Sequence, residues 1–304
     1  MKTRHFLTLL DLTADELKRL IKRAVDIKAT YKRGEAYTPL KNKTMAMIFE
    51  KSSTRTRVSF EAGMAQLGGA SLFLSPQDTH LDRGEPVEDT AKVMSRMVDV
   101  IVIRANNHDM VERFATHSRV PVINALTDGH HPCQLLADIQ TYMEQRGDIA
   151  GRTVAWIGDG NNVCHSWMQA ACRFGFHLNI ANPKGYGPDA ALLKAYQEHV
   201  TLTEDPGRAV QGADIVVTDT WASMGQESEK TERLKAFDGF RVDSALMQQA
   251  KKEAVFMHCL PAYRGHEVTA ELIDGPQSVV WDEAENRLHA QKALLEFLLV
   301  DKPK

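Results

Sequence analysis

The sequence has little of several features that mark particular classes of protein. Four of its 304 residues are cysteine and none forms a CxxC pair, so neither a zinc knuckle nor a thioredoxin-type site is indicated. No apolar run approaches the roughly 18 residues of a membrane span, and the first 20 residues lack the apolar core of a signal peptide. The formal net charge of −3 argues against a general nucleic-acid binder. We therefore expect a cytoplasmic protein with free thiols and no membrane or nucleic-acid partner.

The composition is that of an ordinary globular protein, with 43% hydrophobic residues and a length that suits two domains or one large one. A capping box of Thr13 and Glu16 predicts the start of an N-terminal helix. After it, short apolar segments alternate with helical patterns, which is typical of parallel sheets built from βαβ units. The expected strands are Met45–Phe49, Ala70–Leu74, Val100–Ile103, Val122–Ala125, Thr153–Ile157, Leu178–Ala181, Ile215–Thr218, Val255–His258 and Val279–Trp281. The expected helices are Thr56–Leu67, Val87–Met97, Met110–Thr116, Gln134–Gln145, Val163–Phe174, Ala190–Glu198, Met247–Glu253 and Glu283–Val300. So many strands indicate an α/β fold of two sheets, divided near the helix that begins at Gln134.

The first candidate site follows the expected strand Met45–Phe49, where hydroxyl and basic residues crowd between Lys51 and Arg57. A strand-to-helix turn directs backbone N–H groups and the positive end of the helix dipole at one spot. Serine and threonine hydroxyls add short donors, and an arginine fork matches phosphate oxygens. This pattern predicts a phosphate pocket, and the alternative is a helix cap with solvated arginines. The glycines of a Walker loop are absent, so a nucleoside triphosphate is not indicated.

The second candidate site lies between the expected strand Val122–Ala125 and the helix that follows it. Pro132 suits the first turn of that helix, and His131 and Gln134, three residues apart, can face one pocket. A histidine can donate to a developing oxyanion, and a glutamine can accept from an amide. The alternative is an ordinary loop with exposed histidines.

Two further candidates follow the expected strands Thr153–Ile157 and Ile215–Thr218. The first is GDGNN at 158–162, a strand–turn–helix junction like those of doubly wound sheets, although Val163 stands where a dinucleotide fingerprint needs its third glycine. Its two asparagines can hold a carboxylate or form a plain turn. The second is Asp219, at the carboxyl end of a strand, where it can take an ammonium group or cap a loop.

The last two candidates lie near the C-terminus. HCLP at 258–261 ends an expected strand, and the bond before Pro261 is a candidate for the cis form, which would aim carbonyls into a cleft. A lone cysteine such as Cys259 is more often a small buried residue than a nucleophile. Arg287 falls in the first turn of the last helix, where the dipole disfavours a cation, so it indicates a nearby bound anion. Otherwise it is a surface arginine paired with Glu283.

Together and in this order, these motifs resemble the aspartate/ornithine carbamoyltransferase family over nearly the whole chain. STRTR at 53–57 resembles the family's carbamoyl-phosphate signature, and HPCQ at 131–134 resembles its second phosphate-side motif. Asp219 with SMG at 223–225 and HCLP at 258–261 resembles the ornithine branch in particular.

The resemblance implies transfer of the carbamoyl group of carbamoyl phosphate to the side-chain amine of L-ornithine, giving L-citrulline and phosphate in arginine metabolism. It implies two doubly wound parallel-sheet domains: residues 1–133 with a C-terminal helix, 284–304, that packs back on them, for carbamoyl phosphate, and residues 134–283 for ornithine. No metal or organic cofactor is implied. The expected assembly is a homotrimer with shared active sites, which His80 of a neighbouring subunit completes. Carbamoyl phosphate is expected to bind before ornithine, with domain closure and movement of residues 223–231.

The resemblance also assigns roles residue by residue. The expected carbamoyl phosphate-binding residues are Ser53, Thr54, Arg55, Thr56, His80, Arg104, His131, Pro132, Cys133, Gln134, Cys259, Leu260 and Arg287. The expected ornithine-binding residues are Asn162, Asp219, Ser223 and Met224. The expected catalytic residues are Arg55, Arg104, His131, Asp219 and Cys259, the last acting without a covalent intermediate.

Three alternatives stay open at this point. One is a carbamoyltransferase with another amine acceptor, and the second is a non-catalytic relative that keeps the fold. Intact motifs at 53–57 and 131–134 argue against the second. The third is a dinucleotide oxidoreductase, which Val163 disfavours.

Overall fold

The computed structural model describes residues 3–79, 84–222 and 229–300. The chain divides into two compact units. Unit 1 consists of Met1–Gln140 and Asn286–Lys304, and unit 2 of Thr141–Glu285. The boundaries expected for the functional domains, 133/134 and 283/284, stay predictions.

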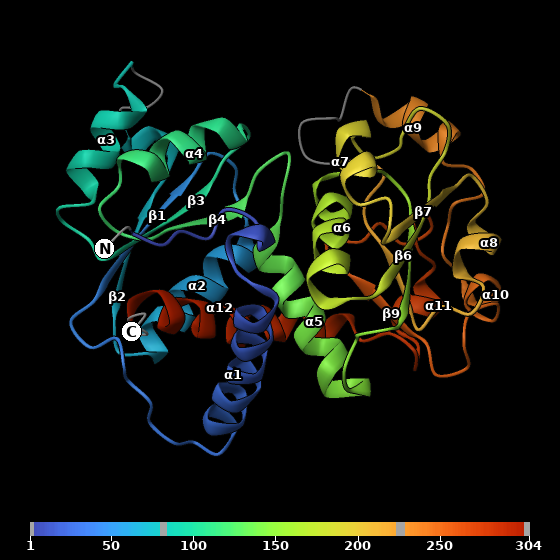
Figure 1. Cartoon of the computed structure of the whole chain (residues 1–304), viewed down its shortest axis with the longest axis horizontal. Coiled ribbons are helices and arrows are strands. Elements are labelled where there is room, and N and C mark those ends of the chain that lie inside the picture. Colours follow the sequence, from blue (N-terminus) through green and yellow to red (C-terminus); the bar gives the residue numbers. More distant parts are fainter. Residues whose placement is uncertain (1–2, 80–83, 223–228, 301–304) are drawn as a thin grey trace. The chain divides into compact units, whose positions relative to one another are not determined.

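Unit 1 contains a four-stranded parallel sheet in the order β2-β1-β3-β4. Its strands are β1 (Thr44–Phe49), β2 (Ala70–Leu74), β3 (Val100–Arg104) and β4 (Val122–Leu126). Its helices are η1 (Leu9–Asp11), α1 (Ala14–Lys32), α2 (Thr54–Gln66), η2 (Pro76–Asp78), α3 (Val87–Met94), α4 (His108–His117) and the first part of α5 (Pro132–Arg146). Figure 1 shows α3 and α4 on one side of the sheet and α1, α2 and α12 (Val280–Leu299) on the other. Ile48, Ile101 and Phe114 belong to the apolar cluster on the side of α3 and α4.

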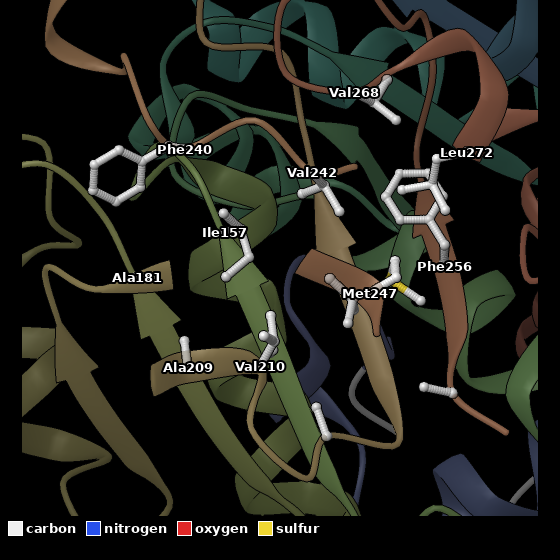
Figure 2. Close-up of a cluster of buried hydrophobic side chains, with 14 of the residues drawn as sticks. Ile157, Ala181, Ala209, Val210, Phe240, Val242, Met247, Phe256, Val268 and Leu272 are labelled. Carbon is white, nitrogen blue, oxygen red and sulfur yellow. The ribbon is translucent and has the colours of Figure 1, made fainter. Parts of the chain in front are cut away.

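Unit 2 contains a five-stranded parallel sheet in the order β7-β6-β5-β8-β9. Its strands are β5 (Thr153–Ile157), β6 (His177–Ala181), β7 (Val200–Thr203), β8 (Ile215–Thr218) and β9 (Val255–His258). Its helices are α6 (Asn162–Phe174), α7 (Ala190–Ala195), α8 (Pro206–Val210), α9 (Lys230–Ala236), α10 (Ser244–Met247) and α11 (Ala270–Ile273). Figure 2 shows the apolar cluster on one face of this sheet, where Val210, Met247 and Leu272 of three helices meet Ile157 and Phe256. The expectation of two doubly wound parallel-sheet α/β domains is confirmed.

The first helix forms where the sequence predicts it. Thr13 and Glu16 make a complete capping box: each side chain bonds the other's backbone N–H. The helix buries Leu17, Leu20 and Ile21 on one side.

The C-terminal helix packs on unit 1, as expected. Its part from Asn286 onward belongs to that unit, where the Lys292 ammonium donates to the Gln66 side chain at 2.9 Å and Glu296 pairs with Arg23 at 2.8 Å. Burial lowers the pKa of Lys292 to about 8, so much of this ammonium charge is held away from water.

Two sequence-based expectations about elements are wrong, and one strand was missed. The segment Val279–Trp281 is no strand: a single bridge joins Ser278 to Phe256, and α12 then begins at Val280. The sequence missed β7, whose alternating valine, leucine and threonine residues form an edge strand without a continuous apolar run. The helix expected at Met247–Glu253 is instead α10, Ser244–Met247, which begins earlier because the Asp243 side chain caps it there.

Both sheets reverse their strand order at one place, which is where open α/β sheets bind ligands. In unit 1 the reversal lies between β1 and β3, and in unit 2 between β5 and β8. These are the strands whose carboxyl ends carry most of the predicted site residues. Among the described helices, none has the length and apolar character needed to cross a membrane.

Candidate active site

In unit 1 the site begins where β1 passes into α2. Ser53 is the N-cap of α2, and its hydroxyl accepts from the Thr56 N–H at 3.3 Å. Arg104, the last residue of β3, lies in register with Phe49 and is 6% exposed. The Arg104 carbonyl accepts from Glu50 N–H at 2.8 Å, which ties the carboxyl ends of β1 and β3 together. A helix N-terminus and a buried arginine thus share one edge of the sheet.

Arg287 joins three helices at this edge. Its guanidinium donates to the Gln134 side-chain oxygen at 2.6 Å and to the Thr56 hydroxyl at 3.2 Å. Gln134 in turn donates to Asp138 at 2.8 Å, so its amide is fixed from both ends. Because Arg287 is only 2% exposed, the alternative of a surface arginine is wrong.

His131 lies among three arginines. It is 5% exposed, and burial lowers its pKa well below 6.5, as do the charges of Arg287, Arg104 and Arg55. The imidazole is therefore neutral at neutral pH and can donate from only one ring nitrogen. We call Arg55, Thr56, Arg104, His131, Gln134 and Arg287 the arginine cluster. Such an arrangement suits a phosphate dianion and a developing oxyanion.

Four other residues expected to bind carbamoyl phosphate in unit 1 lie outside the arginine cluster. Thr54 is exposed in the first turn of α2, and Pro132 is the first residue of α5. The buried Cys133 thiol points to the Asn124 carbonyl at 3.4 Å, and burial raises its pKa to about 12. Only the backbone of Cys133 is therefore suited to meet a ligand. His80 lies outside the described residues.

In unit 2 the site centres on Asp219, which follows β8 and is 8% exposed. One carboxylate oxygen accepts from the Thr220 N–H at 2.7 Å and from the Cys259 thiol at 3.2 Å. The other accepts from the Asn161 side-chain amide at 2.8 Å. We call Asn161, Asp219 and Cys259 the aspartate cluster. It places a carboxylate with fixed orientation where an ammonium group can be bound.

Cys259 and Leu260 follow β9 in an unusual backbone conformation. Leu260 has φ of +58°, and the bond to Pro261 is cis, as the sequence suggested. The Leu260 N–H donates to His258 Nδ1 at 2.8 Å, while the His258 N–H donates to Glu283 at 2.9 Å. This turn is held from both sides, so the carbonyls of Cys259 and Leu260 have defined directions.

Sequence reasoning chose Asn162 for this side, whereas the side chain that contacts Asp219 is that of Asn161. Asn161 is the N-cap of α6: its oxygen accepts from Val163 N–H, which leaves its NH₂ group for Asp219. The signal was available, since an asparagine N-cap always keeps a free amide donor. Ser223 and Met224 lie outside the described residues.

Asp219, His258 and Cys259 also form a group of possible metal-ligating side chains, with one atom of each within 4.8 Å of the others. The hydrogen bonds already described engage each of these three side chains, since His258 Nδ1 accepts from Leu260 and the thiol donates to Asp219. The donor set therefore suits an internal hydrogen-bond network.

Comparison with known proteins identifies the family. A family model described as the carbamoyl-P binding domain of aspartate/ornithine carbamoyltransferase matches residues 4–144, and one described as the Asp/Orn binding domain matches residues 150–298. The chain belongs to the aspartate/ornithine carbamoyltransferase family. Within this family it is 64% identical to a protein of Nitrosococcus oceani over 303 residues, 100% of both chains, and 65% identical to one of Methylococcus capsulatus over 299 residues, 98% of this chain and 99% of that one. Both are named ornithine carbamoyltransferase.

Solved structures agree with this family membership. The ornithine carbamoyltransferase of Pyrococcus furiosus is 49% identical, with a TM-score of 0.95 over 99% of this chain and 98% of that one. The enzyme of Burkholderia thailandensis is 53% identical, with a TM-score of 0.92 over 98% and 99%.

Proposed function

We propose that the protein transfers the carbamoyl group of carbamoyl phosphate to the side-chain amine of L-ornithine, giving L-citrulline and phosphate. Relatives of 64% and 65% identity named ornithine carbamoyltransferase support ornithine as the acceptor. The observation that carries the proposal is the convergence of Arg55, Arg104 and Arg287 on a buried, neutral His131. Such a concentration of positive charge fits a doubly charged donor that leaves as phosphate.

The phosphate of carbamoyl phosphate binds at the N-terminus of α2. Ser53, Thr54, Arg55 and Thr56 surround it there, and Arg104 joins them from the end of β3. Backbone N–H groups, hydroxyls and guanidinium groups together supply the donors that phosphate oxygens accept from. Residues 1–133 and 284–304 form the domain for this substrate, and residues 134–283 the domain for ornithine.

The carbamoyl group needs a different set of partners. Thr56, Arg104 and His131 donate to its carbonyl oxygen, where negative charge develops as the amine attacks. The carbamoyl NH₂ group donates to the carbonyls of Cys259 and Leu260. Other contacts come from Gln134, Arg287 and the backbone of Pro132 and Cys133.

Ornithine is bound through its backbone ammonium and carboxylate. Asp219 supports this part of the proposal, because its carboxylate is oriented by three donors and can accept from an ammonium. Asn162, Ser223 and Met224 complete the binding of ornithine. Cys259 orients the side-chain amine through its position beside Asp219.

Only the neutral side-chain amine of ornithine can attack, although a free amine of this kind has a pKa of about 10.4. Positive charge from the arginine cluster and loss of water both lower that pKa in the complex. The amine nitrogen then bonds to the carbonyl carbon, and the bond from that carbon to the phosphate oxygen breaks. The departing phosphate takes the amine proton, so no separate general base is required.

The assay that tests the proposal is citrulline formation by the purified protein. Ornithine, aspartate, putrescine and N-acetylornithine are compared side by side at equal concentration, each with carbamoyl phosphate. We expect ornithine to react with a kcat/KM at least about 100-fold above the others, because a site built around substrate polar groups rejects analogues that lack them. A faster reaction with another acceptor, or no reaction with any of them, would overturn the proposal.

The protein assembles as a homotrimer with shared active sites. Large apolar side chains are exposed in unit 1 on α2, β2 and the region of α3: Val58 at 57%, Leu72 at 52%, Val93 at 48% and Met97 at 75%. The strand β2 is at the edge of its sheet, where unpaired backbone groups and apolar side chains favour contact with another chain. In the proposed trimer, a second copy of the chain covers these apolar side chains and this strand edge.

The variant Leu72→Glu is expected to dissociate the trimer, since burying three carboxylates in the contacts is costly. Sedimentation velocity measures the outcome. Leu202→Glu is the matched control, because Leu202 lies on β7, the edge strand of the other sheet, and is 47% exposed. If Leu72→Glu sediments as the wild type does, β2 is not in the subunit contact.

The setting of this reaction follows from the same proposal. Citrulline formation from ornithine places the protein in arginine metabolism. All four cysteines lie in the described residues and none of them forms a disulfide, which favours a reducing compartment such as the cytoplasm.

A further inference from the structure

Arg233 of α9 is a buried cation that none of the roles described so far uses. It is 7% exposed. Its guanidinium donates to the Trp221 carbonyl at 2.8 Å and pairs with the Asp159 carboxylate at 3.1 Å. It also lies over the Tyr186 ring, 5.1 Å from the centroid. One side chain therefore binds the segments that follow three strands, β5, β6 and β8.

The partner of Arg233 in the segment after β5 is equally buried. Asp159 is 8% exposed, and its carbonyl accepts from the Trp156 indole N–H at 2.9 Å, so its backbone is fixed as well. The pKa of Asp159 is raised to about 6, mainly by burial: the charge and hydrogen bond of Arg233 lower this pKa, and the nearby charges of Asp219 and Glu229 raise it. An ionised carboxylate in such a place depends on its cation.

The contacts of Arg233 connect the two chain segments that carry the Asn161 and Asp219 side chains of the aspartate cluster. Asp159 precedes Asn161 by two residues, and Trp221 follows Asp219 by two. The hydrogen bond from Asn161 to Asp219 thus lies between the two points that Arg233 holds. The Trp221 ring is held by the C-cap residue of α9, because it stacks on Phe237 with the ring centroids 5.5 Å apart and an angle of 18° between the ring planes.

We propose that Arg233 and Asp159 are positioning residues for ornithine: their ion pair holds Asn161 and Asp219 in the orientation that presents the Asp219 carboxylate to the substrate. The inference rests on the proposed function, since it assigns a role within ornithine binding. Arg233 and Asp159 touch no substrate themselves. One guanidinium nitrogen, Nη1, contacts both the Trp221 carbonyl and the Asp159 carboxylate while the planar group lies over the Tyr186 ring, an arrangement that an ammonium on a flexible chain reproduces less well.

The test is the variant Asp159→Asn, which keeps the shape and the acceptor oxygen but removes the charge. At pH 7.5 we expect the KM for ornithine to rise about 10-fold or more, since a charge-assisted hydrogen bond is roughly twice as strong as a neutral one and orientation errors are costly. The KM for carbamoyl phosphate is expected to change less than about twofold, because the residues proposed for its phosphate, Ser53–Thr56 and Arg104, lie in unit 1. Arg233→Lys is expected to share the ornithine defect.

The matched control is Glu229→Gln. Glu229 also pairs with Arg233, at 3.2 Å, but its side chain is 57% exposed, so the pair contributes little. The same acid-to-amide change is expected to leave the KM for ornithine unaltered. Equal effects of Glu229→Gln and Asp159→Asn would overturn the inference.

The pH dependence distinguishes positioning from simple support of the fold. Below its pKa of about 6, Asp159 is protonated and the wild type loses the charge that the variant lacks at every pH. The ratio of the ornithine KM of Asp159→Asn to that of the wild type is therefore expected to fall toward one as the pH drops from 7.5 to 5.5. The charged and titratable groups facing Asp159 are Arg233 and Glu229 of α9 and its N-cap, Asp219 after β8, and Cys164 of α6. Taking a ratio cancels the ionisation of ornithine itself.

The possible outcomes separate the two proposals. A wild type that forms no citrulline overturns the proposed function. An active wild type with an Asp159→Asn variant whose ornithine KM is unchanged at pH 7.5, or whose KM values rise equally for both substrates, overturns only the positioning role.

Discussion

Replacing Arg55 by alanine is expected to lower kcat for citrulline formation by about 10³-fold, or about 4 kcal/mol of transition-state stabilisation. Arg55 is in the first turn of α2, and its charge acts on His131 together with those of Arg104 and Arg287. Negative charge moves onto the phosphate as it departs, so a guanidinium fork bound to it contributes most in the transition state. Steady-state kinetics with both substrates saturating measures the loss.

The fold is expected to survive this change, since Arg55 is only half-buried near the start of its helix. Arg57→Ala is the matched control from the same helix. The Arg57 guanidinium pairs with Glu61 at 3.0 Å and covers the Phe73 ring at 3.7 Å, on a different face of α2. We expect its kcat to stay within about threefold of the wild type, as for other surface changes. Near-normal turnover of Arg55→Ala would remove Arg55 from the proposed site.

Local chemistry explains which parts of the fold were predictable. The strands Ala70–Leu74, Thr153–Ile157 and Val255–His258 were predicted at their observed bounds, because each is a short apolar run between polar residues. The edge strand β7 lacks that signal: its two middle residues are exposed, so its pattern resembles a loop. In the run Val279–Trp281, Val279 and Val280 are buried around the start of α12, whereas Trp281 is 56% exposed.

The candidate site was predictable to the extent that parallel strands bring their carboxyl ends together. Arg104 follows from the end of β3 and Asp219 from the end of β8, before any contact is known. The burial of Arg287 does not follow in this way. It depends on where α12 packs, and the sequence left a surface arginine paired with Glu283 as the alternative.

Arg233 shows a second limit of sequence reasoning. It stands in a polar stretch after β8, where nothing local distinguishes it from a solvated arginine. Its partners, Asp159 and Trp221, are 74 and 12 residues away along the chain, as 233 minus 159 and 233 minus 221 give. Only the strand order β6-β5-β8 brings these loops to one place. A residue whose partners come from three strand ends cannot be found from the spacing of one motif.

The variant Gly160→Ala is expected to be the most damaging small change in unit 2. A Cβ atom at this position would lie 2.2 Å from the Gly187 carbonyl carbon and from the Pro188 nitrogen, both backbone atoms that cannot rotate away. The Gly160 N–H also donates to the Tyr186 carbonyl at 2.8 Å, which fixes the two loops at this close approach. The loops must separate to admit a methyl group.

We expect two measurable results from that separation. Overpacking that shifts backbone costs about 3 kcal/mol of unfolding free energy, which urea titration reports. Because Asn161 is the next residue, its donor to Asp219 moves, and a displacement of about 1 Å in such a group lowers kcat/KM for ornithine about 100-fold.

Gly185→Ala is the control from the facing loop. Gly185 has φ of +88° with open space around it, so alanine there adds conformational strain of about 1–2 kcal/mol but no clash. It is expected to keep most of the ornithine kcat/KM, because nothing near Asn161 is displaced. If the two alanine variants proved equally active with ornithine, the close contact between Gly160 and Gly187 would not be what sets the orientation of Asn161.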